Sequence, residues 1–470
     1  MIGLQGDIPV PQAETVRHSA KGRWIDDWDP ENEEFWERVG KRVARRNLVW
    51  SILAEHIGFS VWLSWSVVAA RLPAAGFPYT TDQLFALVAL PGLVGALVRF
   101  PYTFAVPKFG GRNWTLVSAL LLLIPTLSLI VLVQRPSTPL WCMQLAAATA
   151  GLGGGNFSSS MTNISFFFPD RQKGWALGLN AAGGNIGVSS VQLVVPLVVG
   201  YGLLPGSTQK VHLENAGLIW LLPILVATIG AWFYMDNLSQ ARSSFKDQVV
   251  VGRRAQTWIM SFLYVGTFGS FVGFSAAFPL LLKTQFPSVT ANIAFLGALV
   301  GSLSRPFGGW LADKFGGARI TFINFFAMAL GSVGVLAALG RHDIVLFLVA
   351  FLALFVTTGI GNGSTFRMIP VIFRAVHGVD QQTGEARAAA AARARRESAA
   401  VIGIAAAIGA LGGYFIPRSF AASIKASGGP MLAVKYFLAF YLLCCISTWW
   451  FYMRRRFLTK LLPSLAEAKA

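Results

Sequence analysis

The chain has 470 residues, of which 54% are hydrophobic and only 13% charged, and its mean hydropathy is +0.57. This composition excludes a soluble globular protein and predicts a polytopic membrane protein. A net charge of +18 can indicate nucleic-acid binding, but the basic residues are spread among loops, so we expect no nucleic-acid partner. The three cysteines form no CxxC or Cys/His spacing, which predicts neither a metal site nor a disulfide.

Twelve apolar segments are each about as long as the 20 residues that cross a bilayer as a helix. They are residues 48–70, 83–106, 114–133, 140–162, 173–200, 216–236, 256–280, 290–313, 318–340, 344–373, 397–417 and 432–453. The sequence therefore predicts an all-α membrane protein with twelve transmembrane helices. Of the 39 Lys and Arg residues, 28 fall on the side that both termini share, eight on the other side and three within spans. By the positive-inside rule we expect a multi-pass protein of the cell inner membrane with both termini in the cytoplasm. The polar residues before the first span predict no signal peptide.

Residues 1–46 are expected to form a cytoplasmic arm. Within this arm, residues 25–46 predict a short amphipathic helix with Asp29 as its cap and Pro30 at its first position. Its apolar face consists of Trp28, Phe35, Trp36 and Val39. This face either lies on the inner membrane surface or belongs to a solvated arm, and we favour the solvated arm because four residues are too few to anchor a helix.

The first span contains Glu55 and His56, the acid and the histidine that lie well inside a predicted span. Glu55 is therefore the candidate for a proton-coupling carboxylate. Alternatively it lies in the cytoplasmic third of the span, eight residues after Asn47, and is hydrated there. His56 points to another face of the helix, and we expect a neutral, packed imidazole.

Two arginines stand at matching positions in the second and eighth spans. The segments GALVRFPYTFAVPKFGGR around Arg99 and GSLSRPFGGWLADKFGGAR around Arg305 both place Gly four residues before the Arg and Phe-Gly-Gly ten residues after it. The motif GLGGGNFSSS at Gly151 is echoed by GIGNGSTF at Gly359, and GLNAAGGNIG in the fifth span by GIAAAIGALGG in the eleventh. These repeats predict two pseudo-symmetric six-helix halves.

The expected organisation follows from this repeat. It consists of the arm at 1–46, the first half at 47–236, a cytoplasmic linker at 237–255, the second half at 256–453 and a cytoplasmic tail at 454–470. A further cytoplasmic loop, 374–396, is rich in Ala and Arg and is expected to be helical in part.

The paired arginines are the candidate binding residues. Placing an Arg deep in a span costs roughly 2.5 to 3.5 kcal/mol, and Glu55 cannot pair with both of them. A guanidinium keeps its proton and presents a flat fork of donors, which suits a flat oxyanion whose charge is shared over two or three oxygens. The alternative is that Arg99 and Arg305 bind backbone carbonyls or Glu55. A third arginine, Arg367 in the tenth span, either lines the path or snorkels to the cytoplasmic interface, which we favour.

Residues 151–187 form two glycine-rich spans joined by a short charged link. Small residues allow membrane helices to approach closely, and we expect this packing to matter during conformational change. The glycines concerned, with their counterparts in the eleventh span, are Gly153, Gly154, Gly155, Gly183, Gly184, Gly187, Gly409 and Gly412. The same spans contain the amides Asn156, Asn163, Asn180 and Asn185, which are costly in a bilayer unless they meet each other, a water or a solute.

The loop GGWLADKFGGARIT, with Asp313 as its acid, resembles the cytoplasmic loop signature of the major facilitator superfamily. Its first-half copy, VPKFGGRNWT, lacks the acid. Within that superfamily the chain resembles, over almost its whole length, the nitrate/nitrite porters of NarK type. The most specific segments are GGGNFSSSMTNISFFFP, GLNAAGGNIG, the two Arg contexts and SFLYVGTFGSFVGFSAAF in the seventh span.

The resemblance implies that Arg99 and Arg305 clamp the anion and that Asn185 contacts it. It also implies that Phe157, Tyr264 and Phe268 bracket the anion. Ala406 departs from the pattern, since a serine is expected there in some members, and Glu55 with His56 departs from the apolar first span of some exchangers.

The expected function is therefore transport of nitrate and nitrite by alternating access, as nitrate/nitrite exchange. Nitrate/proton symport through Glu55 or His56 is the alternative. We expect no enzyme activity, no catalytic residues and no cofactor, with the lipid bilayer as environment and a monomeric carrier.

Overall fold

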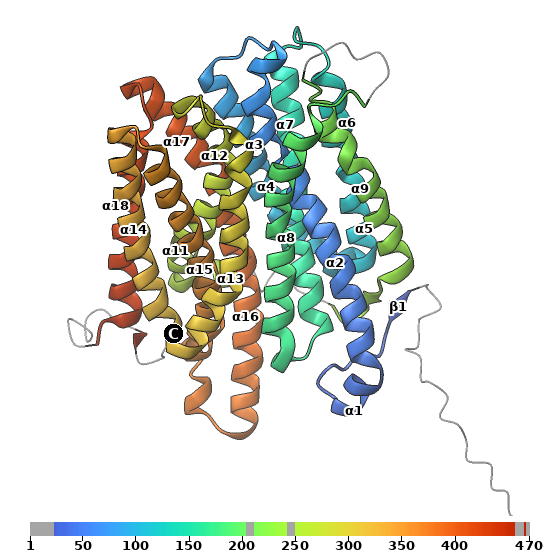
Figure 1. Cartoon of the computed structure of the whole chain (residues 1–470). Coiled ribbons are helices and arrows are strands. Elements are labelled where there is room, and N and C mark those ends of the chain that lie inside the picture. The colour runs from blue at the N-terminus through green and yellow to red at the C-terminus, as the bar shows by residue number, and fades with distance from the viewer. Residues whose placement is uncertain (1–22, 204–210, 242–249, 456–464, 467–470) are drawn as a thin grey trace, which may run out of the picture.

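The computed structural model of the chain describes residues 23–203, 211–241, 250–455 and 465–466. Parts of the predicted arm, linker and tail therefore lie outside the described residues. Long helices run roughly side by side through the molecule, as Figure 1 shows. We divide the elements into two sets, a first set that ends at β2 and a second set that begins at α11. The first set comprises β1 (Trp24–Ile25), α1 (Glu33–Phe35), η1 (Trp36–Gly40), α2 (Lys41–Trp62), α3 (Ser64–Val68), η2 (Ala69–Arg71), η3 (Pro73–Ala75), α4 (Thr81–Phe109), α5 (Gly111–Leu121), α6 (Leu123–Leu132), α7 (Leu140–Phe167), α8 (Asp170–Val198), α9 (Asn215–Tyr234) and β2 (Asn237–Leu238).

The second set of elements follows the linker. It comprises α11 (Ala255–Tyr264), η4 (Val265–Gly269), α12 (Ser270–Gln285), η5 (Ala291–Ala294), α13 (Phe295–Phe315), α14 (Gly317–Arg341), α15 (Ile344–Val376), η6 (Val379–Gln381), α16 (Gly384–Ala410), α17 (Gly412–Ser427), α18 (Met431–Thr448) and η7 (Trp449–Met453). The Ala/Arg-rich segment expected to be helical in part is largely the first half of α16.

Ten helical segments of the described chain are long and apolar enough to cross a membrane. The helices α7 and α13 are not among the ten, although both pack among the others, α7 against α4 and α13 against α15. Glycine, serine and asparagine lower the hydropathy of α7, and α13 contains charged residues in addition to glycine. The protein is thus a multi-pass membrane protein, and the count of twelve spans stays a prediction.

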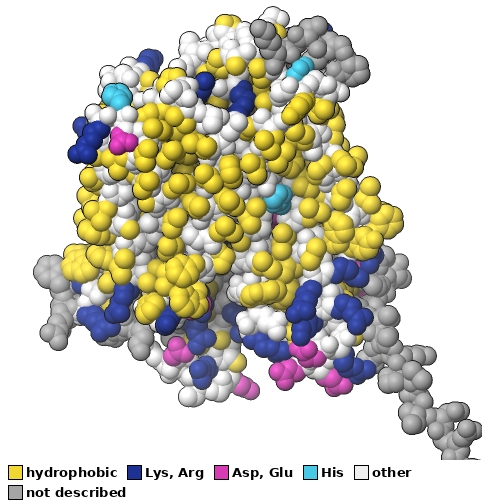
Figure 2. Space-filling view, viewed as in Figure 1, with side chains coloured by type: hydrophobic (Ala, Val, Ile, Leu, Met, Phe, Trp, Pro, Cys, Tyr) yellow, Lys and Arg dark blue, Asp and Glu magenta, His cyan; other side chains and the backbone are white. Residues whose placement is uncertain are grey.

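The surface has a wide apolar band around its middle. Figure 2 shows this band, with most Lys, Arg, Asp and Glu side chains of this face gathered at the end of the molecule that carries α1. We refer to this end as the α1 end. Large apolar side chains such as Val131, Leu222 and Phe233 are exposed within the membrane-spanning helices, as expected for a lipid-facing surface.

The N-terminal arm differs from the sequence-based expectation. The first helical turn starts at Glu33, and Asn32 rather than Asp29 caps it by accepting a hydrogen bond from the Phe35 amide (3.1 Å). Trp28 and Trp36 are buried instead of lying on a membrane surface or in water. Both interpretations of this apolar face are therefore wrong.

The arm is docked onto the α1 end of the first set. The Trp28 ring packs edge-on against Phe167 and the Trp36 ring against Phe168, at centroid distances of 5.3 and 5.6 Å. Strand β1 pairs in parallel with β2, which directly follows α9. A carboxylate of the arm, Glu31, accepts a hydrogen bond from the Asp170 amide at the start of α8 (2.8 Å). The arm therefore ties the ends of α7, α8 and α9 together.

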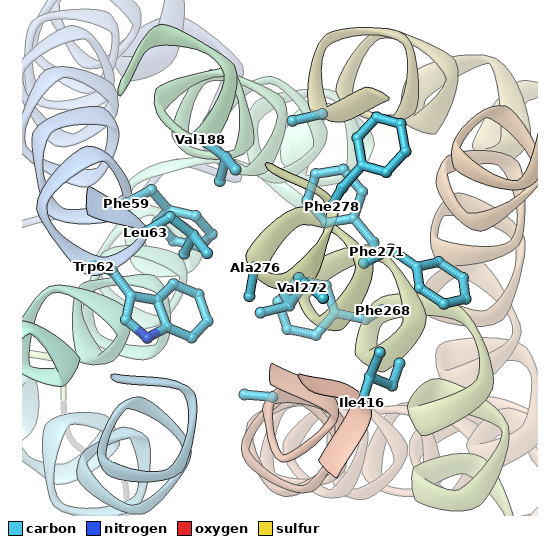
Figure 3. Packing of buried hydrophobic residues seen from close by; sticks show 14 of the residues in the cluster. Phe59, Trp62, Leu63, Val188, Phe268, Phe271, Val272, Ala276, Phe278 and Ile416 are labelled. Carbon is cyan, nitrogen blue, oxygen red and sulfur yellow. The ribbon is translucent and has the colours of Figure 1, made fainter. Parts of the chain in front are cut away.

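The two sets of helices meet along α4, α8, α13, α16 and α17. Figure 3 shows the apolar packing at this boundary, with Phe59, Trp62 and Leu63 facing Val272 and Ala276 of α12. This packing makes the boundary between the two sets apolar, and the paired arginines lie beside it.

Polar contacts join the two sets at both ends of the molecule. At the α1 end, Arg395 on α16 forms an ion pair with Asp170 on α8 (3.1 Å). At the opposite end, Arg418 pairs with Asp82 (3.1 Å) and Arg71 donates to the Asn292 side chain (2.6 Å). Burial lowers the pKa of Arg71 to about 10, so it remains charged at neutral pH.

Candidate functional site

Arg99 lies on α4 with 0% of its surface exposed. Its Nε donates to the Gly154 carbonyl on α7 (3.0 Å), and its Nη1 donates to the Ala406 carbonyl on α16 (2.8 Å). These bonds hold the guanidinium between the two sets of helices. Its Nη2 is buried and has no hydrogen-bond partner among the described residues. The N–H groups of this nitrogen can therefore donate to a ligand.

Arg305 lies at the matching position on α13 and is also buried. Its Nη2 is 3.5 Å from the Tyr264 hydroxyl, at the limit of a hydrogen bond. Its Nη1 is buried without a partner in the described part of the chain. Each arginine therefore keeps one unpaired guanidinium nitrogen in the interior.

Aromatic rings surround both guanidinium groups. The Phe157 ring contacts both of them, with its centroid 4.8 Å from Arg99 Cζ and 5.7 Å from Arg305 Cζ. Phe268 stacks against Phe157 at 5.9 Å and against Tyr264 at 5.3 Å. The structure thus brings together five of the six residues predicted to bind substrate. The result is a buried cluster of two guanidinium groups and aromatic rings, which we call the chamber, in which electrostatic interactions are stronger than in water.

Local backbone geometry explains how the rings reach this position. Phe268 belongs to η4, a π-helical turn that interrupts the seventh predicted span between α11 and α12. Such wide turns shift the helix phase and often occur at functional sites. On the facing side, Gly409 packs against the Tyr264 and Phe268 rings, where a Cβ would come within 2.8 Å of Tyr264 Cδ1. A helix with a larger residue there would push the rings away from the chamber.

Asn185, the sixth predicted residue, is buried on α8. Its Oδ1 has no hydrogen-bond partner, and in the described residues no hydrogen bond joins Asn185 to either arginine. Its predicted contact with the substrate stays a prediction. The eight glycines predicted to permit close packing all do so, because a Cβ at any of them would come closer than 3.0 Å to a neighbouring atom.

Glu55 has 0% of its surface exposed, so the interpretation of a hydrated carboxylate is wrong. Its Oε2 accepts hydrogen bonds from Ser160 Oγ (2.6 Å) and Asn180 Nδ2 (2.8 Å), and Ser51 Oγ contacts Ser160 Oγ (2.9 Å). No ion pair to this carboxylate occurs within the described residues. The alternative in which Glu55 pairs with the arginines is therefore wrong in this conformation, whereas the alternative of backbone carbonyls is confirmed for Arg99, which donates to those of Gly154 and Ala406.

His56 and Arg367 lie away from the chamber. The His56 Nδ1 is 3.1 Å from the Gly183 carbonyl, consistent with the packed imidazole that we expected. Arg367 is half exposed at the α1 end and forms an ion pair with Asp313. This arrangement fits an arginine that reaches the interface rather than one that lines the path.

Three contributors to the site were not predicted from the sequence. The Ala406 carbonyl takes the place of the side-chain hydroxyl expected there, and a backbone atom leaves no signature in the residue type. Trp62 lies 5.2 Å from Arg99 Cζ, but its indole is one of 15 Trp residues in an apolar sequence. Ser160 looked like part of a small-residue packing run, and its bond to Glu55 depends on the relative rotation of α2 and α7.

Comparison with known proteins adds a second line of information. A profile of the Major Facilitator Superfamily matches residues 49–392. The chain is 46% identical over 451 residues to the protein named "Nitrate/nitrite transporter NarU" of Escherichia coli (strain K12), a match that covers 93% of this chain and 97% of that protein. It is 37% identical to the "Probable nitrate/nitrite antiporter NarK2" of Thermus thermophilus, covering 87% of this chain and 92% of the relative.

Solved structures agree on the fold. The crystal structure of a D-xylose-proton symporter superposes with a TM-score of 0.64, covering 86% of this chain and 96% of that chain. At 16% identity this similarity concerns the fold alone.

Proposed function

Because the chain belongs to the Major Facilitator Superfamily and, within it, to the nitrate/nitrite porters of NarK type, we propose that it carries nitrate and nitrite across the cell inner membrane by alternating access. It acts as a monomeric carrier and has no catalytic chemistry. The observation that carries this proposal is the pair of guanidinium nitrogens without a partner among the described residues, Arg99 Nη2 and Arg305 Nη1, on two arginines that both contact the Phe157 ring.

The chemistry of this chamber suits a small planar anion. Each guanidinium keeps one nitrogen without a partner among the described residues, whose N–H groups can donate to an oxygen of nitrate or nitrite, and a buried anion needs both charge compensation and hydrogen bonds. The stacked rings of Phe157 and Phe268 leave flat apolar walls, which restrict the orientation of the ion. Asn185 on α8 is proposed to add a hydrogen bond when α8 moves toward the substrate.

Alternating access requires the contacts between the two sets of helices to break in turn. Opening toward the α1 end breaks the Asp170–Arg395 ion pair, and opening toward the other end breaks the Asp82–Arg418 pair. The hydrogen bond from Arg99 to the Ala406 carbonyl joins the two sets beside the site. Substrate binding at Arg99 therefore competes with, or reorganises, the contact that holds the sets together.

Exchange follows from the charge of the chamber. Two buried cations without an anion are costly to move through an apolar constriction, whereas a bound monovalent anion offsets part of that charge. A carrier of this kind reorients when loaded and stalls when empty, so influx of one anion requires efflux of another. Two relatives from Thermus thermophilus are named as probable nitrate/nitrite antiporters.

Burial of Glu55 supports a second candidate, nitrate/proton symport. A carboxylate enclosed by α2, α7 and α8, with no ion pair to any residue that the structure describes, is the kind of group that binds and releases a proton during transport. The arginines are not suited to this role, because a guanidinium keeps its proton.

Purified protein in liposomes distinguishes the two candidates. For exchange, external nitrate enters only liposomes that contain nitrite or nitrate, a proton gradient has little effect, and Glu55→Gln retains exchange. For symport, a proton gradient drives nitrate into liposomes without internal anion, and Glu55→Gln abolishes this uptake. Failure of both anions to be transported under either condition contradicts the proposed function itself.

We propose that the α1 end faces the cytoplasm. The positive-inside rule assigns the side richer in Lys and Arg to the cytoplasm, and these side chains gather at the α1 end in Figure 2. The two halves are proposed to be residues 47–236 and 256–453, with the arm, linker and tail on the cytoplasmic side.

A further inference from the structure

Asn362 on α15 is a buried amide that the proposed function does not use. It is 1% exposed, and neither its Nδ2 nor its Oδ1 has a hydrogen-bond partner among the described residues. An interior amide without partners is unfavourable, and most such groups are satisfied by protein, water or ligand. The side chain is therefore available to a solute that enters the protein.

The contacts of its neighbours show which way Asn362 faces. Gly363 and Gly359 pack on α13, Gly363 against the backbone of Arg305 itself. Gly361 packs against Asn324 of α14 and Thr267 of η4 on another side of α15, and one turn on the Thr365 hydroxyl lies 3.2 Å from that of Thr267. In an α-helix with 3.6 residues per turn, position 362 lies between these two faces. Asn362 consequently faces the wedge between α13 and η4, the elements that hold Arg305 and Phe268.

The residue one turn further along α15, Phe366, lies near Arg305 and Tyr264. Side chains four residues apart lie on one face of a helix, so Asn362 shares its face with Phe366. The Phe366 ring is 5.6 Å from Arg305 Cζ and 6.4 Å from the Tyr264 ring. One turn away from Asn362, this face of α15 is already part of the chamber wall.

The internal repeat gives independent support. The segment from Gly359 to Gly363 matches the segment from Gly151 to Gly155, with Asn362 in the place of Gly154. The two segments also make equivalent contacts, since Gly151 packs on α4 beside Gly95 and Gly359 packs on α13 beside Gly301, each four residues before the arginine.

In the first set, the residue equivalent to Asn362 is Gly154, which lies directly beside Arg99. Gly154 accepts the Arg99 Nε hydrogen bond with its carbonyl, and the space that a side chain would need is occupied by the Trp62 ring. Asn362 has an amide side chain where Gly154 has none. The repeat thus places this amide beside Arg305.

We propose that Asn362 donates a hydrogen bond from Nδ2 to the bound anion and that this bond favours nitrate over nitrite. This inference rests on the proposed function. Nitrite has two oxygens, which the two arginines and Asn185 can satisfy, whereas nitrate has a third oxygen that needs a further donor in an apolar chamber. A site that leaves a buried acceptor unpaired discriminates against the ligand that carries it.

Equilibrium binding of nitrate and of nitrite to the purified full chain tests the proposal. In Asn362→Ala the Kd for nitrate is expected to rise about 3-fold to 10-fold, the effect of one neutral hydrogen bond, while the Kd for nitrite changes less than about 2-fold. Asn362→Ser keeps a donor and is expected to retain most of the preference for nitrate.

Asn156→Ala is the matched control. Asn156 is also a buried asparagine, 3% exposed, with both amide atoms unpaired in the described structure, but its Nδ2 packs against Gly58 on α2. The ratio of the two Kd values is expected to stay unchanged in this control.

The ratio of the Kd values for nitrate and nitrite distinguishes a specific contact between Asn362 and the anion from a purely structural role of Asn362. If Asn362→Ala weakens nitrate and nitrite equally, or if Asn156→Ala shifts the ratio as much, the inference is wrong while the proposed function stands. If Asn362→Ala does not fold, Asn362→Leu fills a similar volume without a donor: a selective rise in the Kd for nitrate supports the inference, and an equal change or no change in both Kd values contradicts it. If the wild-type chain binds neither anion, the proposed function itself fails.

Discussion

Replacing Arg99 by lysine keeps one positive charge in the chamber and removes the planar fork of donors. The guanidinium uses Nε and Nη1 for the Gly154 and Ala406 carbonyls and keeps Nη2 for a ligand. A lysine ammonium is a single nitrogen on a flexible stem, and it cannot occupy these three positions at once.

The size of the effect follows from these contacts. A hydrogen bond that involves a charged group contributes about 1.5 to 3 kcal/mol. If the lysine stays with either carbonyl, the anion loses one such bond, which corresponds to a rise of about 10-fold to 150-fold in the Kd for nitrate. If the lysine turns to the anion instead, two buried carbonyls lose their donor and the contact between α4 and α16 weakens.

Nitrate uptake into nitrite-loaded liposomes measures this effect. We expect Arg99→Lys, and likewise Arg305→Lys, to insert into the membrane and to transport at close to the background rate. Arg112→Lys is the control, because the Arg112 guanidinium also donates to a backbone carbonyl, that of Trp232, outside the chamber. Nitrate transport at close to the wild-type rate by Arg99→Lys would refute the reasoning.

Further predictions concern topology, the arm and helix packing. A cysteine in place of Gln240, an exposed residue after β2, is expected to react with a membrane-impermeant thiol reagent only from the cytoplasmic side, and labelling from outside would reverse the proposed orientation. Trp36→Ala empties a fully buried site and is expected to destabilise the protein by about 3 to 5 kcal/mol, seen as a lower Tm, whereas the exposed Trp258→Ala should leave the Tm nearly unchanged. Gly412→Ala sets a Cβ against the backbone of η4 and is expected to lower transport, whereas Gly309→Ala, with no atom within 4 Å of the added Cβ, should not; equal effects of the two would contradict the packing argument.

Much of the helical framework could be predicted because a long run of apolar residues indicates a segment that is removed from water. The tenth predicted span, 344–373, corresponds to α15 at Ile344–Val376. The same signal does not distinguish a protein interior from lipid or from a membrane surface. Trp28 and Trp36 were for this reason assigned to the wrong environment, and only the neighbouring Phe167 and Phe168 reveal why they are buried.

The candidate site was partly predictable for a similar reason. Arg99 and Arg305 are visible in the sequence because an arginine within an apolar run is costly and because the repeat places both at one depth. The depth of Glu55 could not be judged from its distance to the end of the span, since burial there depends on how α7 and α8 pack over it. The orientation of Asn362 likewise depends on contacts of α15 that no local pattern contains.

The most direct test of the account is calorimetric titration of nitrate into the purified full-length protein. We expect one nitrate to bind per chain, to be displaced by nitrite, and to bind at least about 10-fold more weakly when either Arg99 or Arg305 is replaced by lysine. Binding of nitrate with wild-type affinity in either variant, or no binding of either anion to the wild-type chain, would contradict the assignment of the chamber around Phe157 as the substrate site.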